Sequence, residues 1–73
     1  MMSPSKRKQD ARRRLIIRKL RSSMTTAEMI AERVGVSVRT IYRDIDALRR
    51  QGQPIIGEAG AGYMLRRREV RHG

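Results

Sequence analysis

The stretch "GVSVRTIYRDIDALRRQG", residues 35–52, decides the predicted fold of this chain. It opens with a glycine that can end a preceding helix, continues through Ser37 as the cap of a new helix, and stops at Gly52. Between these points, apolar residues are spaced three, four and three positions apart: Val38, Ile41, Ile45 and Leu48. That spacing predicts a helix over about residues 37–51 with one buried face.

The outward positions of this helix carry two arginines one turn apart, Arg39 and Arg43. Like charges at that spacing repel by roughly 0.2–0.5 kcal/mol, and Arg39 also lies near the positive end of the helix dipole. An anionic partner would reverse both costs. The pair therefore favours a polyanion-binding surface, although arginine is also a good helix former that can simply solvate an exposed face.

Composition narrows the class of partner. The 73 residues include 18 Lys and Arg against 7 Asp and Glu, a formal net charge of +11. Such an arginine-rich balance predicts nucleic acid first and an anionic membrane surface second. No apolar run approaches the roughly 20 residues of a membrane span, and no signal peptide pattern is present. We expect a cytoplasmic, nucleoid-associated protein with no membrane partner.

Metal and cofactor chemistry find little support in the sequence. There is no cysteine, so a disulfide framework and a Cys-based zinc site are excluded. The single histidine, His72, is interpreted as an inert residue of the tail. Asp44 and Asp46 are two positions apart and point in different directions on a helix, so they are not expected to act as paired carboxylates in acid-base catalysis. Asp44 is expected to pair with an arginine of the first helix. No enzyme activity, metal or cofactor is expected.

The chain reads as one domain over residues 9–66 between two basic ends. Residues 1–8, "MMSPSKRK", are interpreted as a flexible arm, and residues 67–73 as a basic tail. A helix over about residues 9–22 follows the arm, with four apolar residues near one face: Ala11, Leu15, Ile16 and Leu20.

A second helix is predicted to start at "TTAE", where Thr25 and Glu28 form a capping-box pattern, and to end at Gly35. After the third helix, "PIIGEAGAGYML" has two short apolar pieces around a glycine-rich turn, which predicts a hairpin over residues 54–66. Because a strand follows the glycines where a dinucleotide-binding loop needs a helix, that loop is disfavoured. Three helices and a two-stranded β-hairpin give an α+β, mainly α, winged helix-turn-helix fold.

Residues 26–66 resemble a known family. "VGVS", "RTIYRDIDALR" and "GYML" look like the N-terminal winged-helix domain of bacterial WYL-domain transcriptional regulators, and are similar to DeoR-type and biotin-repressor-type winged helices. The resemblance implies sequence-specific binding of double-stranded DNA by a transcriptional regulator, with a repressor as the expected role. Those regulators carry a long C-terminal effector region that these residues lack, so no small-molecule effector is expected here.

In such a fold the third helix enters the major groove, and its first turns reach the base edges. Arg39, Thr40 and Arg43 are then the expected readers, while helix starts and the wing reach the backbone or the minor groove. The complete predicted set of DNA-contacting residues is Thr25, Thr26, Ser37, Val38, Arg39, Thr40, Tyr42, Arg43, Gly60 and Tyr63.

Two other functions stay open. The hypothesis that the chain is a basic RNA-binding module is weakened because only Tyr42 and Tyr63 are available to stack on bases. A winged helix can also serve as a protein-interaction module. Whether the chain binds a palindromic site as a homodimer is left open by the sequence.

Overall fold

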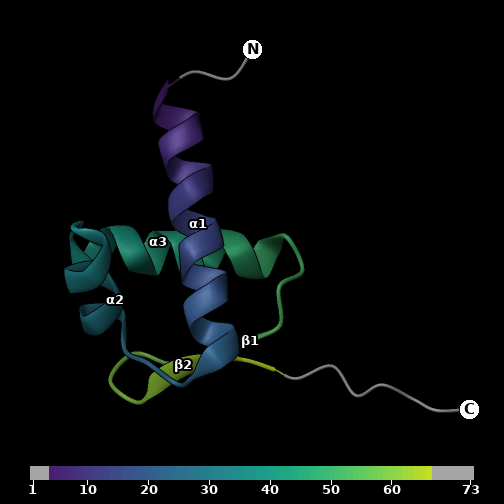
Figure 1. Ribbon diagram of the computed structural model, residues 1–73. Helices are drawn as coiled ribbons and strands as arrows, with labels where there is room; N and C mark the ends of the chain where they lie inside the picture. Colours follow the sequence, from purple (N-terminus) through teal and green to yellow (C-terminus); the bar gives the residue numbers. More distant parts are fainter. Residues whose placement is uncertain (1–3, 67–73) are drawn as a thin grey trace, which may run out of the picture.

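Three helices precede a two-stranded antiparallel hairpin in the computed structural model, which describes residues 4–66 (Figure 1). The elements are α1 (Pro4–Ser22), α2 (Ala27–Val34), α3 (Val38–Arg50), β1 (Ile55–Glu58) and β2 (Gly62–Leu65). This confirms the predicted winged helix-turn-helix order and the α+β, mainly α, class. The predicted tail, residues 67–73, lies outside the described residues.

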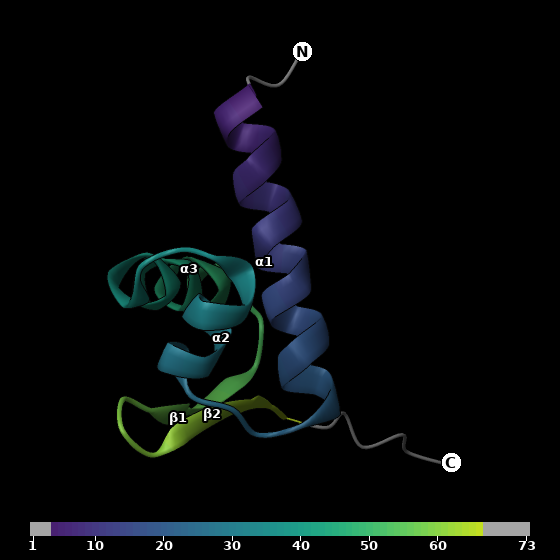
Figure 2. The same cartoon turned by 60° about the vertical axis from the view of Figure 1, so that its left-hand side comes forward.

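The first helix begins earlier than predicted. Residues 1–8 were expected to form a flexible arm, but α1 already starts at Pro4, so from that residue on the prediction is wrong. Proline suits the first turn of a helix, where its missing N–H is not needed, and lysine and arginine are good helix formers. The N-terminal half of α1 consequently projects beyond α3 (Figures 1 and 2).

The core lies where the three helices meet the hairpin. Its buried apolar residues are Ile16, Leu20, Ala27, Ile30, Ala31, Ile41, Ile45, Leu48, Ile55 and Tyr63. The predicted face of α1 is correct for Ile16 and Leu20 but wrong for Ala11 and Leu15, which are exposed, Leu15 by 49%. Both residues lie instead at grooves that flank α1: Ala11 lines one of them, and Leu15 lines two.

The second helix starts one residue later than its expected cap. Thr26, not Thr25, is the N-cap, and its hydroxyl accepts a hydrogen bond from the Met29 N–H at 3.2 Å. Thr25 is buried and pairs with Tyr63 through two backbone hydrogen bonds of 2.9 and 2.7 Å. The chain entering α2 therefore lies beside β2 and joins it through an isolated one-residue bridge. At the other end Gly35 terminates α2 in the left-handed conformation, as predicted.

Both ends of α3 agree with the predicted limits at residues 37 and 51. The Ser37 hydroxyl accepts from the Thr40 N–H at 3.2 Å, and Gln51 caps the C-terminal end. In the hairpin, Ile55 pairs with Leu65 and Gly57 with Tyr63. The Arg66 N–H donates to the Pro54 carbonyl at 2.8 Å, which closes the hairpin at the two limits predicted for the wing.

Candidate nucleic-acid interface

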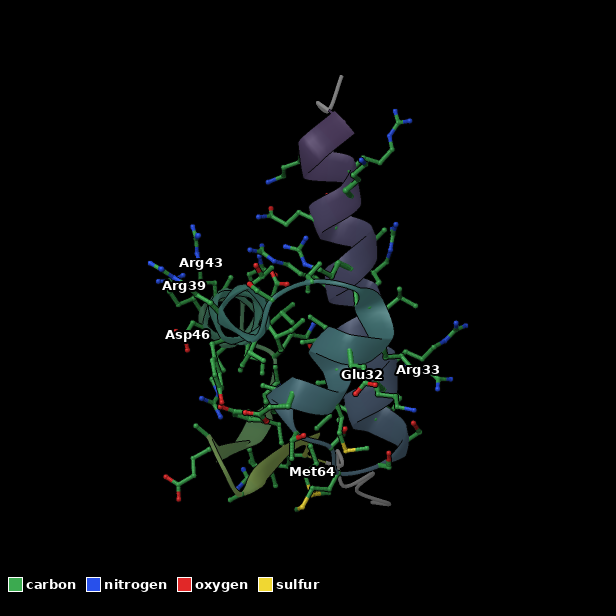
Figure 3. All side chains as sticks on the ribbon, turned by 90° about the vertical axis from the view of Figure 1, so that its left-hand side faces the viewer. Glu32, Arg33, Arg39, Arg43, Asp46 and Met64 are labelled. Carbon is green, nitrogen blue, oxygen red and sulfur yellow. The ribbon has the colours of Figure 1, made fainter. Side chains whose placement is uncertain are left out.

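The outward face of α3 presents two uncompensated positive charges. Arg39 and Arg43 are exposed, and within residues 4–66 neither forms a hydrogen bond or an ion pair. Figure 3 shows both side chains projecting from the side of α3 that faces away from α1. Since Ile41, Ile45 and Leu48 occupy the opposite face of the same helix, core packing fixes the direction in which the arginines point.

The first turn of α3 is held by its own hydroxyl groups. The Thr40 N–H and hydroxyl both contact the Ser37 hydroxyl oxygen, at 3.2 and 3.0 Å. Ser37 is exposed and Thr40 half-buried. The structure therefore brings Ser37, Arg39, Thr40 and Arg43 together at one end of α3, as the sequence predicted, with the exposed hairpin turn at Gly60 as a separate surface.

Other members of the predicted set lie elsewhere. Thr25 and Tyr63 are each 5% exposed, and their side chains belong to the interior that joins the hairpin to α2, which argues against their predicted contact with DNA. Val38 packs against the core. The hydroxyl of Thr26 is already occupied as the cap of α2.

Tyr42 lies at the edge of the core. Its ring packs edge-on against Tyr63, with centroids 6.4 Å apart, and its hydroxyl lies 3.4 Å from a carboxylate oxygen of Glu28, a long hydrogen bond. Partial burial and then the negative charge of Glu28 raise the pKa of Tyr42 above its ordinary value.

Asp44 joins α1 to α3 beneath this face. The residue is 1% exposed, and its carboxylate accepts hydrogen bonds from Arg12 Nη2 at 2.9 Å and Arg13 Nε at 3.0 Å, with Arg12 Nε as a third donor. The predicted pairing with an arginine of the first helix is confirmed. Burial alone would raise the pKa of Asp44, but the hydrogen bonds and charges of the two arginines outweigh it and hold that pKa below its ordinary value.

Sequence reasoning missed Arg49, which fastens the hairpin to α3. Its Nε donates to the Ile55 carbonyl at 3.1 Å and its Nη2 to the Gly57 carbonyl at 2.7 Å, while the guanidinium carbon lies 5.5 Å from the centre of the Tyr63 ring. No sequence signal marks this contact, because its acceptors are main-chain oxygens that every residue carries.

Among residues 4–66, no group of three His, Cys, Asp or Glu side chains is arranged to hold a metal ion. None of the described helices is long and apolar enough to cross a membrane.

These features define a winged helix-turn-helix domain. Its third helix is capped at Ser37, buries one face and carries arginines on the other, and the hairpin that follows is hydrogen-bonded to this helix. The chain belongs to the HTH domain family, whose sequence model matches residues 12–64. It is similar to the uncharacterized HTH-type transcriptional regulator YobV of Bacillus subtilis (strain 168), with 40% identity over 48 residues. That alignment covers 66% of this chain and 15% of the relative's length. No solved structure matches the chain closely enough to count as similar.

Proposed function

We propose that this chain is a sequence-specific, double-stranded DNA-binding regulator of transcription that inserts α3 into the major groove. The observation that carries the proposal is the pair of exposed, unpartnered arginines on the first turns of α3. Arginine donates two hydrogen bonds to the O6 and N7 atoms of guanine, and the first turns of a recognition helix lie nearest the base edges.

The arrangement of the other elements supports this placement. α3 lies between the projecting half of α1 and the hairpin (Figures 1 and 2). A duplex along its outward face meets α1 on one side and the hairpin turn at Gly60 on the other. Asp44 is neutralised internally by Arg12 and Arg13, so its charge does not oppose the phosphates.

The finer assignment follows the resemblance to WYL-domain and DeoR-type regulators. We place the chain with the DNA-binding domains of that group and propose repression as its role. The name of its B. subtilis relative, an HTH-type transcriptional regulator, supports regulation of transcription. Binding as a homodimer to a palindromic site is the arrangement common among helix-turn-helix proteins.

RNA as the main partner is disfavoured by the two tyrosines, the chain's only aromatic residues. Tyr63 is buried, and Tyr42 is partly buried and packs against it, so within residues 4–66 at most one ring can stack on single-stranded bases.

The test is a selection of bound sequences from a random duplex library at near-physiological salt. We expect an enriched motif that contains guanine, and a mirrored half-site if the chain binds as a dimer. Arg39→Ala and Arg43→Ala should each weaken binding by about 1–3 kcal/mol and relax the preference at one position. Salt-dependent binding without any enrichment would contradict sequence-specific recognition.

Arg33→Ala is the matched control for these variants. Arg33 is exposed on α2 and projects on the side of the molecule away from Arg39 and Arg43 (Figure 3). Its removal lowers the net charge by the same amount as the removal of Arg39 or Arg43, but leaves the face of α3 unchanged. If the two α3 variants behaved like Arg33→Ala, the placement of α3 in the groove would be wrong.

A further inference from the structure

A groove of about 300 Å³ runs between α1 and α3, beside the arginine-bearing face. Gln9, Arg12 and Arg13 line it from α1, and Thr40, Arg43 and Arg50 line it from α3. Arg43 lines this groove and also projects from the outward face of α3 (Figure 3). The groove thus borders the surface proposed to read bases, yet it is partly formed by a different helix.

The groove carries an excess of positive charge. Four of its lining residues are arginines, and the carboxylates that oppose them are Asp44 and Asp46. Asp44 is shared by two of the arginines, whereas Arg43 and Arg50 are exposed and form no hydrogen bond or ion pair within residues 4–66. An oxyanion is the ligand that this lining favours.

Arg13 supplies donors that are already in position. Its side chain is 16% exposed and is held by a hydrogen bond from Nε to Asp44, but its two terminal nitrogens make no hydrogen bond among the described residues. Arg12, in contrast, donates hydrogen bonds from both Nε and Nη2 to the same carboxylate. Since Asp44 restrains Arg13 beforehand, a ligand that accepts from its free nitrogens pays little side-chain entropy.

We propose that this groove binds one backbone phosphate of the DNA strand on the α1 side of the major groove, with Arg50 and Arg13 as its ligands. The inference rests on the proposed function. Roughly half or more of protein–DNA hydrogen bonds go to the sugar-phosphate backbone, and these contacts fix the register of the protein on the duplex. Arg39 and Arg43 then read bases, while Arg50 and Arg13 set the position from which they read.

The proposal makes α1 part of the interface. A duplex bound by α3 and the hairpin alone has a footprint limited to the groove and the wing side. A phosphate in the α1–α3 groove extends that footprint to the opposite flank. Arginine suits this role because its fork donates two parallel hydrogen bonds to phosphate oxygens.

Arg50→Gln is the variant of choice, because Arg50 is exposed and its loss breaks no hydrogen bond or ion pair within residues 4–66. On the selected duplex, its plot of log K against log salt concentration should lose about 0.9 in slope, the value for one phosphate contact on B-DNA. The base preference should stay as in the wild type. Arg50→Lys, which keeps the charge, should keep the slope.

Arg33→Gln is the matched control, since it removes one exposed charge from α2. Phosphate-ethylation interference should show a sensitive phosphate on the α1 flank with the wild type and with Arg33→Gln, and lose it with Arg50→Gln. Identical slopes and interference patterns for Arg33→Gln and Arg50→Gln would overturn the inference.

The outcomes separate this inference from the proposed function. A wild-type chain that binds no duplex DNA refutes the function itself. A wild-type chain that binds its selected site, with Arg50→Gln indistinguishable from it, refutes only the phosphate site. Inorganic phosphate, titrated without DNA and followed by NMR, tests a free anion: strong shifts at Gln9 and Arg13 combined with an unchanged DNA slope in Arg50→Gln would assign the groove to a small anion instead.

Discussion

The Nη2 group of Arg49 donates a 2.7 Å hydrogen bond to the carbonyl oxygen of Gly57, which joins the last turn of α3 to the first strand of the wing. The same side chain bonds the Ile55 carbonyl and lies over the ring of Tyr63. A cation also suits this position, because the C-terminal end of a helix carries partial negative charge. One arginine therefore ties the proposed recognition helix to the wing, in addition to the core packing of Ile55 and Tyr63.

Arg49→Gln should destabilise the domain by about 1 kcal/mol, the net value of hydrogen bonds from a partly exposed charged donor. Urea unfolding of the two proteins measures the difference. Arg50→Gln provides the control, since it removes a neighbouring arginine that makes no hydrogen bond or ion pair within the described part of the chain. Equal losses in both variants would mean that Arg49 does not hold the wing.

Gly57→Ala should disrupt the hairpin more than Gly60→Ala. Both glycines have positive φ, +112° and +86°, so either substitution strains the backbone by about 1–2 kcal/mol. A Cβ at Gly57 would in addition lie 2.0 Å from the Gly62 carbonyl oxygen, whereas one at Gly60 meets nothing within 4 Å. Thermal unfolding should rank the proteins wild type, Gly60→Ala, Gly57→Ala, and the reverse order of the variants would refute the packing explanation.

The third helix could be predicted closely because its determinants are local. The cap at Ser37 and the apolar spacing through Ile41, Ile45 and Leu48 lie within the helix itself, and both of its ends agree with the structure. The pairing of Asp44 was also predictable in kind: a carboxylate buried beside a basic helix needs a cationic partner. Which arginines pair with it depends on how α1 crosses α3, and that is a property of the whole fold.

The errors occurred where tertiary contacts decide between equivalent residues. Thr25 and Thr26 are adjacent and both suit a cap, and the backbone pairing of Thr25 with Tyr63 makes Thr26 the cap. The same pairing buries two residues that the sequence placed on the DNA surface. In α1, apolar periodicity could not show that Leu15 lies beside grooves instead of core.

Ser37→Ala should cost about 1 kcal/mol, the typical loss for removal of an N-cap hydroxyl. Ser37 holds both the N–H and the hydroxyl of Thr40, so the first turn of α3 loses two contacts at once. Thr26→Ala is the comparison, because it removes the cap of α2 and leaves α3 intact. If α3 reads DNA, the loss of DNA affinity should be larger for Ser37→Ala than for Thr26→Ala at matched stability.

Asp44→Asn should destabilise the domain strongly, by about 3–5 kcal/mol, because it breaks a buried cluster and leaves Arg12 and Arg13 without a counter-charge. The effect should depend on pH. The pKa of Asp44 is lower in the folded chain than in the unfolded chain, where it is about 3.9. The stabilisation by the ionised carboxylate is therefore complete above about pH 5, declines as the pH falls through the unfolded value, and is lost below the lowered native value.

Urea unfolding between pH 6 and pH 2 checks this dependence. The stability gap between wild type and Asp44→Asn should be constant at neutral pH and should narrow on acidification, since protonation removes from the wild type the charge that the variant already lacks. A gap that stays constant down to pH 2 would contradict the assignment. Should the variant fail to fold, NMR titration of the Asp44 carboxyl in the wild type replaces it, and a midpoint above the ordinary pKa of aspartate would show that burial outweighs the two arginines.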